Sequence, residues 1–400
     1  MQLEGNRITE IGETRRADVT IDGRGKALLP GFVNAHTHAA MTLFRGYADD
    51  MELQAWLSQR IWPAEAKLTP DDIYWGTKLA CLEMIKSGTT CFNDMYFHMD
   101  RAAQAVAEMG IRGVLSEGFI DLNNAERAES EFRKARRVVQ AMEAMRNPRV
   151  VPALGPHAIY TVSEDSLLAM KRWANEKGYR IHIHLSETKA EVDGSRKDRG
   201  TTPPEYLGAL GILGPNVVAA HCCWVDDAEI RTLARHGVKV AHCPVSNMKL
   251  ATGRAMPWGA MHRAGVTVSL GTDGAASNNS LDMFQTMKAA ALLHKFADGP
   301  TVATAKEVFH AATAGGAASL GLDAGTIEVG KLADLILIDA QRPELTPMHD
   351  LVSNVVYAAT GDCVDTVICD GRLVMEGRRV PGEAEILEKA AGIAARLAGG

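Results

Sequence analysis

The chain has 400 residues, of which 46% are hydrophobic and 23% are charged, and its formal net charge is −6. These values are ordinary for a globular protein and exclude disordered and collagen-like classes, and the scattered basic residues argue against a nucleic-acid-binding surface. No apolar stretch is long enough to cross a bilayer, and the first residues lack the regions of a signal peptide. The seven cysteines include no Cys-x-x-Cys spacing, so we expect reduced core thiols and a cytoplasmic location.

The two ends of the chain predict one small β module. Residues 1–29 have the composition of short strands and turns, and the apolar runs 333–339 and 364–374 are further strand candidates. We expect residues 1–29 and 331–400 to pair into a composite β-sandwich that ends in an Ala/Glu/Leu-rich helix. The central domain is then expected to span residues 30–330.

Short β-branched runs alternate with helical segments through this central domain. The runs precede His36 or cover residues 89–94, 113–117, 149–154, 180–184, 217–221, 238–242 and 266–273. One intervening helix has a clear start, because Thr69 can cap it, Pro70 suits its first turn and two acids follow. About eight alternations of strand and helix predict an α/β fold, a (β/α)8 barrel of the TIM type.

Histidines collect at the ends of the predicted strands. In Pro-Gly-Phe-Val-Asn-Ala-His-Thr-His, His36 and His38 alternate along an extended backbone and therefore point to the same side. Later strands end at His157, at His182 and His184, at His221, at His242 and at Asp273. Barrels of this type hold their active sites at the carboxyl ends of their strands. We therefore predict a metal site at this end of the barrel.

The candidate ligands suit a catalytic zinc ion. Such an ion takes three or four nitrogen and oxygen ligands and leaves a position open for water. His36, His38 and His184 offer three nitrogens, and Asp273 adds a carboxylate beside the first strand because the eighth strand closes onto it. Iron and manganese stay open as alternatives, because this donor set does not separate them from zinc.

The ordered motifs are similar to those of one family. They are Pro-Gly-Phe-Val-Asn-Ala-His-Thr-His at 30–38, His-Leu-Ser-Glu at 184–187, His-Cys at 221–222, Gly-Thr-Asp-Gly-Ala-Ala-Ser at 271–277 and Ser-Asn-Met-Lys-Leu at 246–250. The chain resembles the amidohydrolase superfamily and, more closely, its 5-methylthioadenosine/S-adenosylhomocysteine deaminase branch. The likeness covers nearly the whole chain. Such proteins usually open with another strand or two, so we expect this chain to begin late.

The resemblance implies a role for each residue of the metal site. His36, His38, His184 and Asp273 would hold one zinc ion per chain, because the fourth strand ends in His157 where two-metal relatives place a lysine. The ion would lower the pKa of a bound water from ~15.7 towards 7. Asp273 would accept a proton from that water, His221 would orient it, and Glu187 would protonate the purine ring nitrogen next to the attacked carbon. His242 stays open between support of the site and packing, and packing is the expected role of His182.

Substrate-side residues follow from the same resemblance. Glu65 would grip the ribose hydroxyls, His157 would contact the nucleoside, and Trp56 would wall the thioether end of the pocket. The structural alternatives are that Glu65 is an exposed surface residue and that Trp56 is a core residue. Some members that accept S-adenosylhomocysteine have an arginine where this chain has Glu117, and a glutamate would repel the substrate carboxylate. We expect methylthioadenosine or adenosine-like substrates, unless Arg133 or Arg136 substitutes for that arginine.

Three functions are compatible with these motifs. The first is a zinc-dependent deaminase of adenine nucleosides, and the second is a deaminase or dechlorinase of a free heterocycle such as guanine, cytosine or a triazine. Glu187 argues against the dechlorinases, and Glu65 against free bases, which carry no ribose. The third is an inactive barrel, which the complete ligand set disfavours. We expect a small-molecule substrate and neither a nucleic-acid nor a membrane partner, and the sequence leaves a homo-oligomer open.

Overall fold

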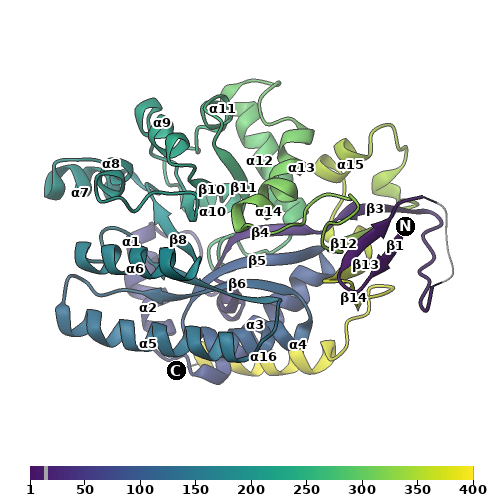
Figure 1. Ribbon diagram of the computed structural model, residues 1–400, viewed down its shortest axis with the longest axis horizontal. Helices are drawn as coiled ribbons and strands as arrows, with labels where there is room; N and C mark the ends of the chain where they lie inside the picture. The colour runs from purple at the N-terminus through teal and green to yellow at the C-terminus, as the bar shows by residue number, and fades with distance from the viewer. Residues whose placement is uncertain (13–16, 400) are drawn as a thin grey trace.

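A computed structural model describes residues 1–12 and 17–399, and its centre is a nearly closed barrel of eight parallel strands (Figure 1). The strands are β4 (Phe32–Thr37), β5 (Thr89–Tyr96), β6 (Arg112–Phe119), β7 (Val150–Pro156), β8 (Arg180–Leu185), β9 (Val217–His221), β10 (Lys239–His242) and β11 (Thr267–Leu270), and they neighbour one another in that order. Most of their residues are buried, as expected for a parallel sheet with helices packed against it. The predicted barrel is confirmed.

Helices connect successive strands. They are η1 (Ala39–Phe44), α1 (Leu53–Trp56), η2 (Leu57–Ile61), α2 (Trp62–Glu65), α3 (Pro70–Lys86), α4 (Met99–Met109), α5 (Ala125–Ala144), α6 (Glu164–Lys177), α7 (Lys189–Arg199), α8 (Pro203–Ala209), α9 (Asp227–Arg235), α10 (Pro244–Lys249) and α11 (Trp258–Arg263). After β11 come α12 (Met283–Asp298), α13 (Ala305–Ala312) and α14 (Ala314–Leu320). The predicted cap of α3 is present, because the Thr69 hydroxyl accepts the Asp72 N–H and Pro70 is the first helical residue.

The barrel closes between β11 and β4 through a few specific hydrogen bonds. The Asn34 side chain accepts the Thr272 N–H at 2.9 Å, and the Asp273 N–H donates to the His36 carbonyl at 3.0 Å. A Cβ atom on Gly271 would lie 3.0 Å from the backbone of His36, so glycine permits this close approach. The eighth strand therefore ends at Leu270, three residues before the sequence predicts, and the following residues leave the ladder to join the first strand.

The two ends of the chain meet in a separate antiparallel sheet. Its order is β14 (Arg372–Met375), β13 (Val364–Cys369), β12 (Leu335–Asp339) and β3 (Lys26–Pro30). A separate hairpin of β1 (Gln2–Glu4) and β2 (Arg7–Glu10) contacts the segment before β12, where the Ile8 N–H donates to the Lys331 carbonyl. Ile8 packs in one cluster with Leu335 and Ile368. The pairing of the two ends is confirmed, while the boundaries 1–29, 30–330 and 331–400 stay a prediction.

The remaining C-terminal elements tie this sheet to the barrel. They are η3 (Pro343–Leu345), α15 (Leu351–Tyr357), η4 (Gly361–Cys363) and α16 (Glu383–Ala398). The last helix runs beside α3, where Arg396 pairs with Asp72 at 2.6 Å and Lys86 with Glu383 at 2.7 Å (Figure 1). Within residues 1–12 and 17–399, none of the helices combines the length and the apolar character needed to span a membrane.

Candidate metal centre and active site

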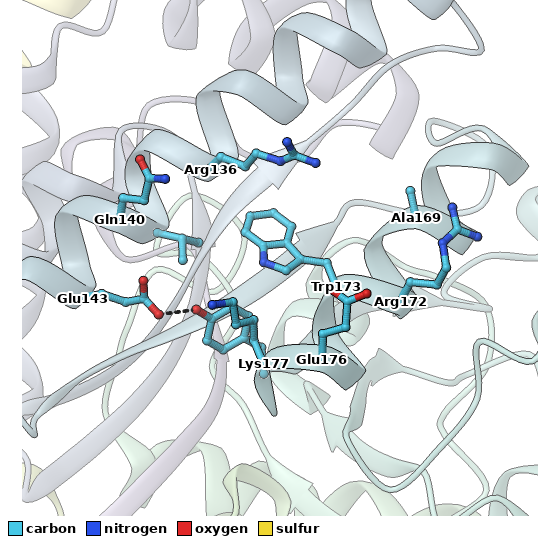
Figure 2. A pocket seen from close by; sticks show the side chains of 10 residues that line it. Arg136, Gln140, Glu143, Ala169, Arg172, Trp173, Glu176 and Lys177 are labelled. Atoms are coloured by element: carbon cyan, nitrogen blue, oxygen red, sulfur yellow. Dashed lines mark hydrogen bonds between the residues drawn. The ribbon is translucent and has the colours of Figure 1, made fainter.

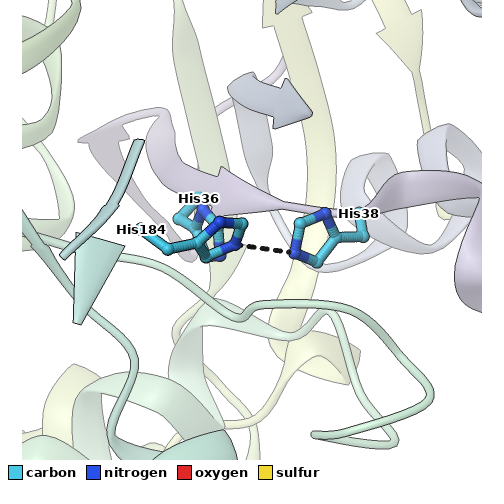
Figure 3. Close-up of side chains that lie close together, drawn as sticks. All are labelled: His36, His38 and His184. Atoms are coloured by element: carbon cyan, nitrogen blue, oxygen red, sulfur yellow. Dashed lines mark hydrogen bonds between the residues drawn. The ribbon is translucent and has the colours of Figure 1, made fainter. Parts of the chain in front are cut away.

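Three imidazoles and one carboxylate converge at the carboxyl end of the barrel. His36 lies on β4, His38 follows directly after the last residue of that strand, and His184 comes from β8 (Figure 3). Nε2 of His36 and Nε2 of His38 lie 3.2 and 3.3 Å from Oδ1 of Asp273, and Nε2 of His184 lies 3.3 Å from Nε2 of His38. Because alternate residues of an extended chain point to the same side, both histidines of the first motif reach the same cluster.

These four residues fit a divalent cation. The buried Nε2 of His36 has no hydrogen-bond partner among the described residues, although it lies beside a carboxylate. Candidate ligand atoms lie within 4.8 Å of one another in two overlapping groups, His36 with His38 and His184, and His36 with His221 and Asp273. Imidazole nitrogen and carboxylate oxygen are the donors that zinc and its neighbours prefer. A cation between them would give each of these lone pairs a partner.

Hydrogen bonds orient two of the imidazoles. Nδ1 of His38 lies 2.6 Å from the Met95 carbonyl, and Nδ1 of His184 lies 2.8 Å from the His157 carbonyl. Because a carbonyl oxygen only accepts hydrogen bonds, both Nδ1 atoms carry the proton. Both Nε2 atoms therefore present a lone pair to the centre of the cluster, which is the form that binds a metal ion.

Burial sets the charge state of the cluster. It lowers the pKa of His36 to about 4, with smaller opposing contributions from Asp273, and it holds the pKa of His184 well below its usual value. Burial alone would raise the pKa of Asp273, but the adjacent His36 and His38 outweigh it and hold that pKa well below its usual value. These shifts favour neutral imidazoles at His36 and His184 and an ionised carboxylate at Asp273, which are the forms that bind a metal ion.

Two serines fix the Asp273 carboxylate. Its Oδ2 accepts hydrogen bonds from Ser246 Oγ at 2.6 Å and from Ser277 Oγ at 3.1 Å, so Oδ1 is left to face the histidines. Asp273 also has a left-handed φ of 63°, a conformation that costs energy outside glycine and is held here by its surroundings. The motifs that contain both serines were recognised in the sequence, but their role becomes visible only in the structure.

Glu187 and His221 lie together beside this cluster. Glu187 Oε1 is 3.9 Å from His221 Nδ1, and the same Nδ1 lies 3.0 Å from the Asn247 side-chain nitrogen. Burial raises the pKa of the Glu187 carboxyl, with a small opposing effect from His221. A raised pKa keeps the acid form of a carboxyl, which can donate a proton, to a higher pH than in an ordinary glutamic acid.

The predicted substrate-side residues lie in three different environments. Glu65 is half-buried and accepts a 2.7 Å hydrogen bond from the Tyr96 hydroxyl, so the exposed alternative is wrong. The His157 ring lies 4.8 Å from that of His184, centroid to centroid. Trp56 is buried in the main core and its indole N–H donates to the Ala48 carbonyl. The roles of Glu65, His157 and Trp56 toward a substrate stay predictions.

Glu117 is committed to a local structural role. Its two carboxylate oxygens accept the backbone N–H groups of His98 and Met99 at the start of α4, at 3.1 and 2.8 Å, and Lys134 pairs with it at 2.8 Å. Its charge is therefore balanced within the protein, and a buried, paired carboxylate exerts little repulsion on a ligand. Glu117 is therefore not expected to repel a substrate carboxylate.

Neither of the alternative arginines belongs to the metal centre. Arg133 pairs with Glu129 on the exposed face of α5. Arg136 lines a cavity of 420 Å³ between α5 and α6, where it lies beside Trp173 (Figure 2). None of the clustered histidines lines that cavity.

The other strand-end histidines form supporting pairs. Nε2 of His182 lies 2.7 Å from Nδ1 of His36, so His182 contacts a candidate ligand, and its expected packing role stays a prediction. Nε2 of His242 lies 3.0 Å from Nε2 of His294 on α12. His242 is in neither of the candidate ligand groups, and burial holds its pKa well below the usual value.

The family model described as "Amidohydrolase family" matches residues 27–374. The chain belongs to the amidohydrolase family. This amidohydrolase is 52% identical over 397 residues to the 5'-deoxyadenosine deaminase of Methanoregula boonei. The matched region covers 98% of this chain and 90% of the relative. It is 49% identical over 404 residues to the 5-methylthioadenosine/S-adenosylhomocysteine deaminase 1 of Archaeoglobus fulgidus, covering 100% of this chain and 95% of the relative.

A solved structure of similar fold contains zinc. The adenosine deaminase of Xanthomonas campestris with bound zinc superposes on this amidohydrolase with a TM-score of 0.88 at 38% identity, covering 93% of this chain and 86% of that one. Zinc is also present in the atrazine chlorohydrolase of Arthrobacter aurescens, with a TM-score of 0.88, 25% identity and coverage of 98% and 94%. Together with the donor set described above, these relatives make this amidohydrolase a metal-dependent aminohydrolase with a site for a divalent ion.

Proposed function

We propose that this amidohydrolase is a hydrolytic deaminase of adenine nucleosides that carries one zinc ion and releases ammonia. The observation that carries the proposal is the half-buried acid Glu187 beside His221, next to the convergent ligands. Relatives that are 47–52% identical and are named 5'-deoxyadenosine deaminase support a nucleoside over a free base. We propose 5'-methylthioadenosine as the preferred substrate, with adenosine and S-adenosylhomocysteine as slower ones.

The metal ligands of the proposal are His36, His38, His184 and Asp273. When bound, the zinc ion supplies Lewis acidity and makes an attacking hydroxide available at neutral pH. Asp273 is ionised and its Oδ1 is unblocked by the serines, so it can accept the proton that the water loses. Ordinary divalent substitutes such as iron or manganese would use the same donors.

Glu187 and His221 complete the proposed reaction. Glu187, whose pKa is raised by burial, donates a proton to the ring nitrogen beside the attacked carbon, which lets that carbon become tetrahedral. His221, whose Nδ1 lies 3.9 Å from the Glu187 carboxylate, orients the attacking water. The carbon–oxygen bond forms first, and the carbon–nitrogen bond then breaks as the amine takes the proton held by Asp273 and leaves as ammonia. The proton of the new hydroxyl group returns to Glu187. One water is consumed and an inosine analogue is produced.

Substrate recognition assigns three further residues. Glu65 is proposed to accept hydrogen bonds from the ribose hydroxyls through the oxygen that Tyr96 leaves available. His157, whose ring lies against His184, is proposed to contact the nucleoside. Trp56 is proposed to support the wall of the pocket from within the core, since its indole N–H is already bonded to the backbone.

Ammonia release tests the function directly. The zinc-loaded protein is assayed side by side with 5'-methylthioadenosine, 5'-deoxyadenosine, adenosine, S-adenosylhomocysteine, guanine and cytosine. Turnover of nucleosides without turnover of the bases is expected, and their order identifies the preferred 5' group. Activity on bases alone would remove Glu65 from its ribose role and favour a heterocycle deaminase. Stripping the metal with a chelator and restoring it with zinc, iron or manganese tests the ion.

A further inference from the structure

The carboxylate of Glu191 holds the turn that carries Glu187. Glu191 Oε1 accepts the Ser186 N–H and Oε2 accepts the Glu187 N–H, both at 2.9 Å. The Glu191 residue is 9% exposed, so these bonds are shielded from water. One buried carboxylate therefore satisfies two successive backbone N–H groups directly at the proposed acid.

The local sequence explains why Glu191 can reach this turn. Thr188 caps α7 and its hydroxyl accepts the Glu191 N–H, which places Glu191 at the third helical position. In an ordinary capping box the acid at that position returns to the N–H of the cap residue itself. Here it reaches one and two residues further back, because Ser186 has a left-handed φ of 50° that bends the chain at this point.

Other helices of the protein show the ordinary arrangement. In α8 the Glu205 carboxylate accepts the Thr202 N–H, and in α13 the Glu307 carboxylate accepts the Thr304 N–H. Both acids bond to their own cap residue. The bonds of Glu191 therefore go beyond what capping α7 requires, and they stabilise a conformation that a serine rarely adopts.

We propose that Glu191 is a positioning residue that fixes the direction of the Glu187 carboxyl toward the substrate ring. This inference rests on the proposed function, because Glu187 is its proton donor. An ionised carboxylate offers acceptors on both oxygens, which the two N–H groups need. A glutamine of the same shape offers one acceptor and one NH2 donor, so one backbone N–H would face another donor. The isosteric change Glu191→Gln is therefore expected to disrupt the turn.

Hydrogen exchange tests the turn without any assay of activity. Backbone amide exchange of the segment 185–188 is compared between the wild-type protein, Glu191→Gln and the control Glu205→Gln. The pH is kept above about 8, because burial raises the pKa of Glu191 to about 7 and the carboxylate must be ionised. Exchange at Ser186 and Glu187 is expected to be faster only in Glu191→Gln. Unchanged protection in that variant would overturn the proposal. This result stands whether or not the protein deaminates nucleosides, so failure of the proposed function remains distinguishable.

Kinetics test the link from Glu191 to Glu187. A misplaced catalytic group costs on the order of 100-fold in rate, so Glu191→Gln is expected to lower kcat by about that factor with little change in KM or metal content. In the Glu187→Gln background the same change is expected to add almost nothing, because the positioned acid is already absent. Independent, multiplicative losses would overturn the role. Glu191→Asp keeps two acceptor oxygens and is expected to retain more kcat than the glutamine variant, and the reverse order would also contradict it.

Discussion

Nδ1 of His36 lies 2.7 Å from Nε2 of His182, and both rings are completely buried. Burial and the neighbouring imidazoles hold the pKa of His182 well below its usual value, so this ring is neutral. A neutral His182 that accepts the proton of His36 Nδ1 leaves the lone pair of His36 Nε2 for a metal ion. The contact gives His182 a part in orienting the site.

Removal of His182 is expected to weaken metal binding. Outer partners of metal ligands are typically worth about 10–100-fold in affinity, so His182→Leu should raise the dissociation constant for zinc by about that factor. Competition with a chromophoric chelator measures it. The matched control is His294→Leu, which removes another buried histidine of a histidine pair, outside the candidate ligand groups. Equal affinities in the two variants would show that His182 serves packing alone.

Replacing the proposed acid is expected to separate catalysis from metal binding. Glu187→Gln removes the proton donor while keeping the shape of the side chain, so kcat should fall by about 100- to 10,000-fold. The metal content should remain that of the wild-type protein, because the four proposed ligands are untouched. Metal analysis and steady-state kinetics on one preparation measure both quantities. Near-normal turnover in this variant would refute the proposed mechanism.

The pH dependence of kcat should follow the protonated form of Glu187. Burial raises its pKa, so the acid form persists to a higher pH than in an ordinary glutamic acid. Turnover is therefore expected to be sustained below the raised pKa and to decline as the pH rises through it. Stopped assays at saturating substrate across the stable pH range give this limb. The declining limb should be absent from the residual activity of Glu187→Gln. A limb that persists in that variant would assign the titration to another group, such as Glu191, whose pKa burial raises to about 7.

Substitution of Glu117 is expected to change stability and not substrate choice. Glu117→Arg would remove the acceptors of two N–H groups at the start of α4 and would place a second cation beside Lys134. Breaking such a buried pair costs about 3–5 kcal/mol, so the variant should have a lower Tm. The ratio of S-adenosylhomocysteine to methylthioadenosine turnover should stay constant. A ratio shifted toward S-adenosylhomocysteine would place this side chain at the pocket.

A buried network of ion pairs between the barrel and the terminal sheet should contribute strongly to the free energy of unfolding. Arg112, at the start of β6, pairs with Asp334 at 3.3 Å and with Asp370 at 2.9 Å, and all three are almost inaccessible. Asp370→Asn is expected to lower the free energy of unfolding by about 3 kcal/mol or more, because it leaves Arg112 with less compensation. Denaturant unfolding measures it. The exposed pair of Arg133 and Glu129 is the control, and Glu129→Gln should cost less than about 1 kcal/mol.

Local sequence rules predicted much of this molecule. The positions of His36 and His38 followed from the strand period, and the start of α3 followed from the hydrogen-bonding chemistry of Thr69 and the fixed φ of Pro70. Alternating buried runs and helices predicted the barrel itself. These features depend on residues that are close in the chain, so their physical cause can be read without knowing the fold.

Tertiary structure decided the rest, because it depends on residues brought together from distant elements. Asp273 reaches the histidines only after the chain leaves β11. Ser246 then donates a hydrogen bond to Oδ2 of Asp273, so Oδ1 is the oxygen that faces the histidines. Glu117, which sequence comparison assigned to substrate discrimination, is occupied by α4 and Lys134. The sequence alone determined the ligand types and their strand ends, whereas the direction of each lone pair depends on partners such as His182, which only folding places within hydrogen-bond distance.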